Sequence, residues 1–539
     1  MKIYDYIVIG SGFGGSVSSM RLAEKGYSVL TIEKGRRFQT EDFPKSNWNI
    51  KKYLWLPQLG FLGFQKLDIY KHAFILSGTG VGGGSLVYAN TLMIPPTEFF
   101  NNPQWKKFGN WEEELKPFYK TASFMLGRTK FEKFNYEDLT LKEVAKDMGK
   151  EESFDNVYVA VYFNEDETAK DPYFNGHGPL RNPCTNCAGC MVGCRENAKN
   201  TLDKNYLWFA EKNGAEIISE TNVWKIEYKD GEYIIHTKRT AGIITHGKKV
   251  FRSKGLIISG GVLGTLKLLL NQKHIYKTLS GLSDTLGQSL RTNSETLCTA
   301  TFADQKLNNS IAISSIFSPN KDTSIEICKY PNKSNMMRNL LTLSVDKKGT
   351  SVARALKFLL KIITHPILFL RMAFNRKWAE HTVVFLVMQT LDNKMQMVLK
   401  KWPFRKTLTI KNTGDKKVNA YIPVGQEVMH RYAKKVNGRA QNSAAEILMN
   451  VPSTAHILGG CQMGETIKTG VVDKNFKVFG YPNMYIIDGS IVQGNLGVNP
   501  SLTITALSEY AMNKIPDKSG NSKIKLEKTL NLKSQIANI

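Results

Sequence analysis

Four of the seven cysteines in the chain lie close together, at a spacing that could bind a metal. Cys184, Cys187, Cys190 and Cys194 follow the C-x2-C-x2-C-x3-C pattern of bacterial ferredoxins, whose thiolates hold iron–sulfur clusters. A three-iron cluster would need only the first three thiolates. A four-iron cluster would need one more, and the remaining cysteines are Cys298, Cys328 and Cys461. Zinc on all four thiolates is one alternative, and a compact turn of reduced, buried thiols leading into a helix is another.

The N-terminal segment carries a dinucleotide-binding pattern. Residues 7–9 predict a buried parallel strand, residues 16–24 a helix, and residues 28–32 a second strand that ends at Glu33. Between the first strand and the helix, Gly10, Gly12 and Gly15 form a G-x-G-x-x-G turn. Its N–H groups can approach a pyrophosphate at the positive end of the helix, and Glu33 can accept hydrogen bonds from a ribose hydroxyl. This pattern alone does not distinguish FAD from NAD.

Three further motifs suggest backbone built around a large ligand. The stretch GVGGGS at residues 80–85 is too flexible for a helix or strand interior, so we expect it to lie flat against a planar group. TAHILGGCQMG occupies residues 454–464. Near the C-terminus, Asp488 ends an apolar strand over residues 484–487, and Asn499-Pro500 opens a helix with proline at the first helical position.

Together these motifs resemble the glucose–methanol–choline (GMC) family of flavoprotein oxidoreductases, and within it the bacterial cholesterol oxidase-like branch. The likeness covers nearly the whole chain, to about residue 514. It implies an α/β fold with a Rossmann-type FAD-binding domain and an α+β substrate domain that has a mainly antiparallel sheet. We expect the FAD-binding domain to be discontinuous, over residues 1–40, 200–295 and 465–514. The substrate domain would span 41–199, with the cysteine run at 184–194, and 296–464, and residues 515–539 would form a basic tail.

The same resemblance implies FAD as the cofactor and assigns the site. His456 and Asn499 take the catalytic positions. His456 could act as a base or as a hydrogen-bond donor to the substrate oxygen, whereas Asn499 is no base near neutral pH and would orient the substrate. Outside this motif, His456 would be a core histidine that caps the turn at 459–460. The implied cofactor-binding residues are Gly10, Gly12, Phe13, Gly14, Gly15, Glu33, Gly82, Gly83, Ser85, Asn90, Val223, Asp488, Gly489, Asn499 and Pro500.

One departure concerns the substrate. Flavin-containing cholesterol oxidases that also move a double bond use a glutamate on a strand over the flavin ring. The candidate strand here, residues 381–393, offers Gln389 and Asp392 but no glutamate. The sequence therefore argues against steroid isomerisation and against cholesterol as the substrate. Alternating strands at 310–318 and 324–330 and the apolar stretch 355–374 still indicate a substrate domain suited to a hydrophobic alcohol.

The charge balance bears on location and partners. The chain has 73 basic and 47 acidic residues, a formal net charge of +26, which suits an anionic surface. No nucleic-acid module is recognisable, so peripheral contact with a membrane is the better interpretation, beside a merely basic composition. Basic residues and Pro366 interrupt the stretch 355–374, which predicts two short amphipathic helices. These helices could enter a membrane interface or cover an apolar substrate pocket, and packing into the core is their simplest role. The N-terminus does not have the pattern of a signal peptide, which favours a reducing, cytoplasmic setting.

The expected function is FAD-dependent transfer of a hydride from the CH–OH group of a hydrophobic alcohol, sterol-like, terpenoid or long-chain, to flavin N5. Oxygen or another electron carrier would be the acceptor, and an iron–sulfur cluster would favour a carrier over oxygen. Two alternatives remain open at this point: a lyase of the same family whose FAD is not reduced, and a membrane-associated flavoprotein without turnover.

Overall fold

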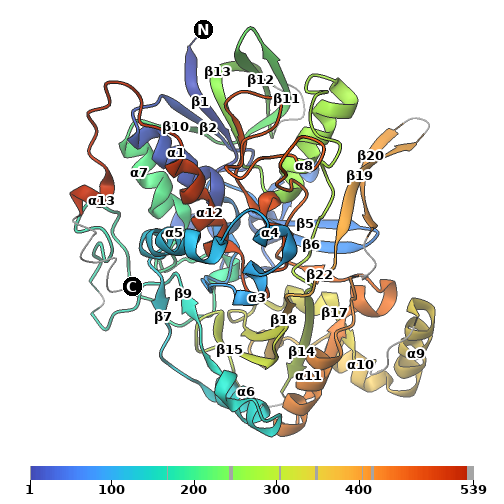
Figure 1. Ribbon diagram of the computed structural model, residues 1–539. Helices are drawn as coiled ribbons and strands as arrows, with labels where there is room; N and C mark the ends of the chain where they lie inside the picture. Colours follow the sequence, from blue (N-terminus) through green and yellow to red (C-terminus); the bar gives the residue numbers. More distant parts are fainter. Residues whose placement is uncertain are drawn as a thin grey trace.

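The computed structural model describes residues 2–166, 168–241, 247–302, 305–345, 350–402, 405–413 and 418–530. Two large sheets lie at opposite ends of the molecule (Figure 1), with the N-terminal strands in one and the middle of the chain in the other.

The first sheet is mostly parallel and is built from segments far apart in the sequence. Its strand order is β10-β2-β1-β13-β12-β11, and β23 also pairs with β13. Buried Ile7 of β1 pairs with Leu30 of β2 on one side and with Leu256 of β13 on the other. The strands are β1 (Ile3–Ile9), β2 (Val29–Ile32), β10 (Glu216–Ile218), β11 (Thr221–Lys229), β12 (Glu232–Arg239), β13 (Lys248–Ile258) and β23 (Met484–Ile486).

Helices α1 (Phe13–Glu24), α7 (Tyr206–Lys212) and α12 (Ser501–Asn513) pack together beside this sheet, and α5 (Trp111–Met125) packs on α12. A buried ion pair joins the two ends of the chain: Arg21 of α1 donates to both carboxylate oxygens of Glu509 of α12, at 2.8 and 2.9 Å. The hydroxyl of Tyr206 donates to the same carboxylate at 2.7 Å. Because breaking a buried ion pair on one side is strongly destabilising, this contact fixes α12 relative to α1.

The second sheet is antiparallel throughout and has the strand order β17-β21-β14-β18-β16-β15-β8. Apolar side chains cover both of its faces, so β16 is buried along its whole length. Helices α6 (Tyr136–Asp147) and α11 (Pro423–Lys435) cover one face. The strands are β8 (Asp155–Asn156), β14 (Thr296–Thr301), β15 (Ile313–Asn320), β16 (Thr323–Cys328), β17 (Leu341–Leu343), β18 (Thr382–Gln389) and β21 (Arg439–Ser443).

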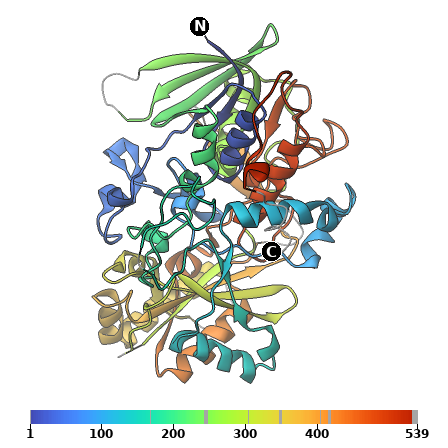
Figure 2. The same ribbon diagram turned by 90° about the vertical axis from the view of Figure 1, so that its left-hand side faces the viewer.

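Smaller elements connect the two sheets (Figure 2). A three-stranded sheet of β5 (Gln65–Tyr70), β6 (Ala73–Gly78) and β22 (Ser453–Thr454) brings the segment before His456 next to the glycine-rich stretch. The other elements are α2 (Ile50–Tyr53), β3 (Trp55–Leu56), β4 (Phe61–Leu62), α3 (Thr97–Phe100), α4 (Pro103–Lys106), β7 (Thr129–Lys130), β9 (Tyr158–Val159), α8 (Val262–Asn271), α9 (Ser351–Thr364), α10 (Pro366–Ala373), β19 (Met395–Trp402), β20 (Arg405–Asn412) and α13 (Leu526–Thr529).

The fold class predicted from the sequence is confirmed: a mixed, mainly parallel sheet of the dinucleotide-binding kind and a seven-stranded antiparallel sheet. The domain boundaries stay a prediction. Two local predictions are wrong. Pro500 is the N-cap of α12, which starts at Ser501, so proline is not at the first helical position. The cysteine run does not lead directly into a helix, because residues 198–205 contain only a short 3-10 turn (Leu202–Lys204) before α7 begins.

The predicted basic tail is partly described. Leu526 and Leu530 are buried, and Lys523 donates through Nζ to the carbonyls of Ala23 and Asn213. This part of the tail therefore lies along α1, and residues 531–539 lie outside the described residues.

Candidate active site

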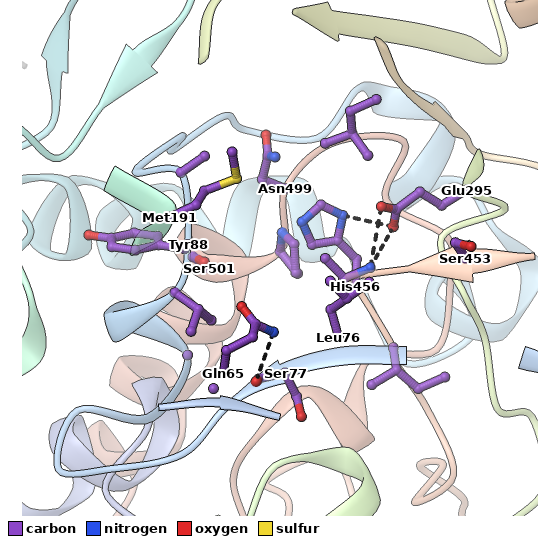
Figure 3. Close-up of a pocket in the computed structure, with 18 of the residues that line it drawn as sticks. Gln65, Leu76, Ser77, Tyr88, Met191, Glu295, Ser453, His456, Asn499 and Ser501 are labelled. Atoms are coloured by element: carbon purple, nitrogen blue, oxygen red, sulfur yellow. Dashed lines mark hydrogen bonds and ion pairs between the residues drawn. The ribbon is translucent and has the colours of Figure 1, made fainter. Parts of the chain in front are cut away.

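A cavity of about 300 Å³ lies between the two large sheets (Figure 3). One end is lined by Gly12, Phe13 and Gly84, from the two glycine-rich segments. The other end is lined by apolar side chains of the antiparallel sheet, among them Leu297 and Val384. The cavity thus joins a backbone-lined end to a hydrophobic end, as sites for a cofactor and an apolar ligand usually do.

The glycines of the first turn have different roles. A Cβ on Gly14 would lie 1.7 Å from the carbonyl oxygen of Ile487, and one on Gly15 would lie 1.9 Å from that of Gly10. Those two glycines are therefore required for packing. A Cβ on Gly12 would meet only the Cα of Gly83, at 3.9 Å, so it would extend into open cavity. Space next to Gly12 is what a ligand lying against the backbone needs.

Glu33 holds the two glycine-rich segments in place. Its Oε2 accepts hydrogen bonds from the N–H of Ser11 at 3.1 Å and from its hydroxyl at 2.8 Å, and Oε1 accepts one from the N–H of Gly35 at 2.8 Å. The hydroxyl of Ser11 in turn accepts from the N–H of Gly82 at 3.2 Å. A role for Glu33 toward a ribose hydroxyl stays a prediction.

Asp488 lies at the floor of the cavity, directly after β23. Its Oδ1 accepts from the N–H and hydroxyl of Ser490 at 2.8 and 2.5 Å, and its Oδ2 accepts from Thr265 at 2.6 Å. Burial raises the pKa of the Asp488 carboxyl above its ordinary value, although these bonds favour the ionised form. Gly489 and Pro500 also line the cavity at this end.

Several buried polar atoms in the segment 89–91, which borders the cavity, have no partner within the described protein. Both side-chain atoms of Asn90 are buried and without a hydrogen-bond partner, and so is the hydroxyl of neighbouring Thr91. Asn90 also adopts a left-handed backbone conformation, with φ of 71°. Unpaired buried amides are costly, and a polar cofactor beside them would remove that cost. The open space at Gly12 and these orphaned atoms fit FAD.

The remaining predicted cofactor residues lie further off. Ser85 donates to the carbonyl of Gly82 at 2.7 Å and accepts from the N–H of Leu202, so its hydroxyl shapes the loop and does not line the cavity. Val223 lies on β11, opposite Thr237, and is likewise not among the cavity-lining residues. Contact of either residue with a cofactor stays a prediction.

His456 lies in the cavity wall beside a buried carboxylate. Its Nδ1 is 3.1 Å from Oε2 of Glu295, which also accepts from the hydroxyl of Thr454 at 2.8 Å. Burial disfavours a charged imidazole, but attraction to Glu295 outweighs it and raises the pKa of His456 above its ordinary value. Figure 3 shows one ring nitrogen directed at Glu295 and the other side of the ring facing Asn499.

Asn499 stands across from His456 and is held by a second carboxyl group. Its Nδ2 donates to Oε2 of Glu326 at 3.1 Å, and its Oδ1 is buried without a partner in the described protein. Burial raises the pKa of Glu326 to about 7, with the bond from Asn499 and the charge of His456 opposing that shift. The structure thus brings His456 and Asn499 together, with one buried glutamate behind each.

Sequence reasoning missed both glutamates. Glu326 is the single charged residue in β16, between Ile325 and Ile327, and that isolation was the available signal. The strand examined instead, β18, places Gln389 away from this cavity, where it bonds Ser294 and Thr323. Asp392 pairs with Arg291 at 2.6 Å. Gln389 is therefore not among the residues that line the cavity, and the lack of a glutamate in β18 does not leave the site without a carboxyl group.

The cysteine run forms part of the wall near the backbone-lined end, where Met191 reaches the cavity. Within the described residues, no three His, Cys, Asp or Glu side chains are placed to hold a metal ion. Cys298 and Cys461 are buried in other parts of the fold, whereas Cys328 is buried in the core against which Cys184 and Cys194 pack. The residues do not fit an iron–sulfur cluster or a four-thiolate zinc site.

A buried lysine that the sequence did not reveal connects the run to the cavity. Nζ of Lys199 donates to the carbonyls of Leu86, Tyr88 and Cys190, at 3.0, 2.9 and 2.7 Å. Burial lowers the pKa of Lys199 to about 7, against these favourable contacts. Lys199 therefore joins the loop after the second glycine segment to the cysteine turn.

Comparisons with known proteins agree with this geometry. Models of the GMC oxidoreductase family match residues 4–273 and 379–508. Cholesterol oxidases of Acinetobacter baumannii and Mycobacterium tuberculosis are each 41% identical to this chain over 96% of its length, covering 95% and 91% of those proteins. A long-chain-alcohol oxidase of Arabidopsis thaliana is 24% identical over 96% of the chain and 68% of that protein.

Among solved structures, pyridoxine 4-oxidase from Mesorbium loti shares the fold, with a TM-score of 0.60 and 14% identity over 95% of this chain and 98% of that one. The family models, the relatives and the paired glycine segments lead to one assignment. The chain belongs to the GMC oxidoreductase family, whose members act on CH–OH donors with FAD.

Proposed function

We propose that this protein oxidises the CH–OH group of a hydrophobic alcohol, sterol-like or long-chain, to the carbonyl, with oxygen as the electron acceptor. The observation that carries the proposal is the position of His456 and Asn499. Both line the cavity that joins the apolar end to the end lined by the two glycine-rich segments. The relatives, cholesterol oxidases and a long-chain-alcohol oxidase, support an apolar alcohol as substrate and oxygen as acceptor.

Bound FAD would accept the hydride from the carbinol carbon and pass both electrons to oxygen, giving hydrogen peroxide. Gly12, Asp488 and Asn90 would hold it, since they supply open backbone, a carboxyl group and unpaired amide atoms. The hydroxyl proton has to leave the substrate in the same reaction, and that step falls to the chain itself.

His456 is the group placed to take this proton. A neutral imidazole within reach of the hydroxyl accepts it, and the Glu295 carboxylate stabilises the imidazolium that results. Nδ2 of Asn499 has a second N–H besides the one it donates to Glu326, and this N–H can donate to the hydroxyl oxygen, which leaves the hydroxyl proton for the imidazole. Glu326 fixes Asn499 from behind through the 3.1 Å bond.

The apolar end of the cavity favours a large hydrocarbon group. Leu297, Ile313, Val384 and Leu386 of the antiparallel sheet line it, opposite Leu76 of β6. Burying apolar substrate surface on such a wall gives roughly 25 cal/mol per Å². Because Glu326 supplies a buried carboxyl group beside Asn499, sterols remain among the substrates that this proposal covers.

The direct test is anaerobic titration of the FAD-bound protein with long-chain primary alcohols and 3-hydroxysterols. Loss of the flavin absorbance near 450 nm with formation of the carbonyl compound supports oxidation. Turnover without loss of absorbance would assign the lyase alternative. His456→Ala should retain FAD and lower kcat by about 100-fold or more. An unchanged kcat in this variant would contradict the role of His456, and lack of turnover with all of these alcohols would favour the non-catalytic alternative.

The acceptor is tested separately. In air, each mole of carbonyl product should consume one mole of oxygen and form one mole of hydrogen peroxide. Product that forms only with an added artificial acceptor would contradict the oxygen part of the proposal. Such a result would leave the alcohol oxidation itself intact.

A further inference from the structure

Two helices carry an unusually exposed apolar surface. Helices α9 and α10 meet at Pro366, as predicted, but only one side of the pair packs into a core, so the prediction of core packing is wrong for the other side. In Figure 1 they lie at the outer edge of the antiparallel sheet, beside β17. We call their exposed apolar side chains the docking face: Val352, Leu356, Leu359, Leu360, Ile363, Ile367, Leu370 and Phe374.

The exposure of the docking face is large even for surface residues. Ile363 is 75% exposed, Phe374 70% and Ile367 66%. Along α9 the exposed apolar residues recur every three to four positions, which places them on one side of the helix. A contiguous apolar face of this kind on a folded protein usually marks an interaction surface.

The opposite side of the pair is firmly attached to the rest of the protein. Phe358 is buried in a small core with Leu343 and Ile447. Arg354 forms a fully buried ion pair with Glu446 at 2.5 Å. Nζ of Lys361 donates to the carbonyl of Ser344 at 2.7 Å. The docking face is therefore presented by anchored helices, and its exposure is built into the fold.

The charge around the docking face has one sign. Residues 350–379 contain six Lys and Arg and no Asp or Glu. The charge of Arg354 is neutralised in its buried ion pair with Glu446, whereas four of the other basic residues have exposed side chains. These four basic residues are Lys357, Arg371, Arg376 and Lys377.

From this combination we propose that the docking face binds an anionic lipid bilayer, with α9 and α10 lying in the plane of its interface. Apolar side chains enter the acyl boundary of a bilayer when an amphipathic helix lies on it, and basic side chains beside them meet anionic headgroups. A protein partner would need acidic groups and a matching shape, whereas a bilayer needs only this pattern. Within the described ranges, every helix is too short or too polar to span a membrane.

The position of α9 and α10 relative to the cavity links the proposed membrane contact to substrate entry. Helix α10 packs on β17 and on the 3-10 turn Asn335–Leu340. That same segment supplies Met337, Leu340 and Leu341 to the cavity lining. Only the segment 335–343 would therefore separate α10, at the bilayer, from the apolar end of the cavity. An alcohol dissolved in the bilayer would have a short path to that end.

Vesicle co-sedimentation tests the surface without any turnover. The FAD-bound protein should bind vesicles that contain phosphatidylglycerol and should bind pure phosphatidylcholine vesicles more weakly. Leu356→Gln/Ile363→Gln/Ile367→Gln should lower binding about tenfold or more, because three apolar side chains leave the interface. The matched control is Ile69→Gln/Leu180→Gln/Ile524→Gln, whose side chains are 70%, 63% and 70% exposed elsewhere, and it should bind as the wild type does.

A second set of variants tests the charge. Lys357→Gln/Arg371→Gln/Arg376→Gln should weaken binding to anionic vesicles by roughly fivefold per side chain, the factor that matches about 1 kcal/mol for each. The loss should shrink as salt is raised, because salt screens these contacts. The control changes exposed lysines elsewhere: Lys146→Gln/Lys229→Gln/Lys468→Gln.

The flavin spectrum and the melting temperature show whether each variant is folded; if the triple apolar variant is not, the single variant Ile363→Gln replaces it. Equal vesicle binding by the apolar variant and its control overturns the proposal. Equal binding to both lipid compositions overturns it as well. So does self-association that the apolar variant abolishes while vesicles stay unbound, since a second copy would then cover the face. Because no substrate is present, these outcomes are independent of the proposed oxidation.

Discussion

The imidazole Nδ1 of His456 lies 3.1 Å from a carboxylate oxygen of Glu295, a side chain with no exposed surface. Glu295 directly precedes β14, and His456 follows β22, so the two arrive from different sheets. Thr454 holds the carboxylate with a 2.8 Å bond from its hydroxyl. The pair is thus prearranged to carry a positive charge on the imidazole.

Glu295→Gln should lower the pKa of His456, because burial remains while the attraction that outweighs it is removed. If His456 takes the substrate proton, it must be neutral, so the acidic limb of the kcat/KM profile should move to lower pH. Pre-steady-state rates of flavin absorbance loss between pH 5 and 9 measure this. Glu295→Asp, which keeps the charge, should restore the profile in part. A shift of the alkaline limb alone would show that His456 acts as a charged donor.

Glu326 should make stability fall as the pH rises. The pKa of Glu326 is raised from 4.5 to about 7, so the folded state holds its proton over a range in which the unfolded state has lost it. The stabilisation is complete below about pH 4.5 and is lost as the pH passes through 7, a change on the order of 3 kcal/mol.

Glu326→Gln should remove this slope. The measurement is the free energy of unfolding in urea between pH 5 and 8 for wild type and variant, taken as a difference so that other titrating groups cancel. A difference that does not change across this range would contradict the raised pKa. The bond to Asn499 is preserved in the variant, since a glutamine oxygen also accepts it.

Local patterns in the sequence were enough to predict some elements correctly. The turn between β1 and α1 depends on residues next to one another in the chain, and the structure has it at residues 10–12, with α1 starting at Phe13, earlier than the predicted residue 16. The break between α9 and α10 at Pro366 follows from the missing N–H of proline. The fold class, in contrast, was predicted from the resemblance to the GMC family and not from local patterns.

The parts that sequence reasoning missed depend on contacts between distant strands. Glu295 and Glu326 acquire their roles only when β14 and β16 are set beside the segments that carry His456 and Asn499. The exposure of α9 was missed for a different reason. Apolar periodicity predicts that one side of a helix avoids water, and it does not state whether protein or another apolar phase covers that side.

The glycines of the first turn provide a matched set of variants. Gly14→Ala should prevent stable folding, because its Cβ would lie 1.7 Å from the carbonyl oxygen of Ile487. Gly12→Ala should fold, since its φ of −72° suits alanine and nothing in the described protein lies closer than 3.9 Å to the new Cβ. That methyl group would occupy the cavity, so FAD affinity should fall by about tenfold or more.

Gly264→Ala is the control for this set, because its Cβ would meet nothing within 4 Å inside α8. It should retain FAD and gain up to about 1 kcal/mol of stability. Isothermal titration of FAD into the apoprotein and thermal unfolding measure the two effects. Gly12→Ala with unchanged FAD affinity would show that the cofactor does not lie against this turn.

Protein purified without oxygen should contain FAD but neither iron nor zinc in stoichiometric amounts. The physical reason is geometric, since no three His, Cys, Asp or Glu side chains among the described residues are placed to hold a metal ion. Elemental analysis together with the visible spectrum measures this.

Cys187 is the exposed member of the run, so alkylation should modify it first, and Cys187→Ser should leave flavin reduction by the alcohol unchanged. Stoichiometric iron whose absorbance disappears in Cys187→Ser would reverse this conclusion and reopen a route for electrons other than oxygen.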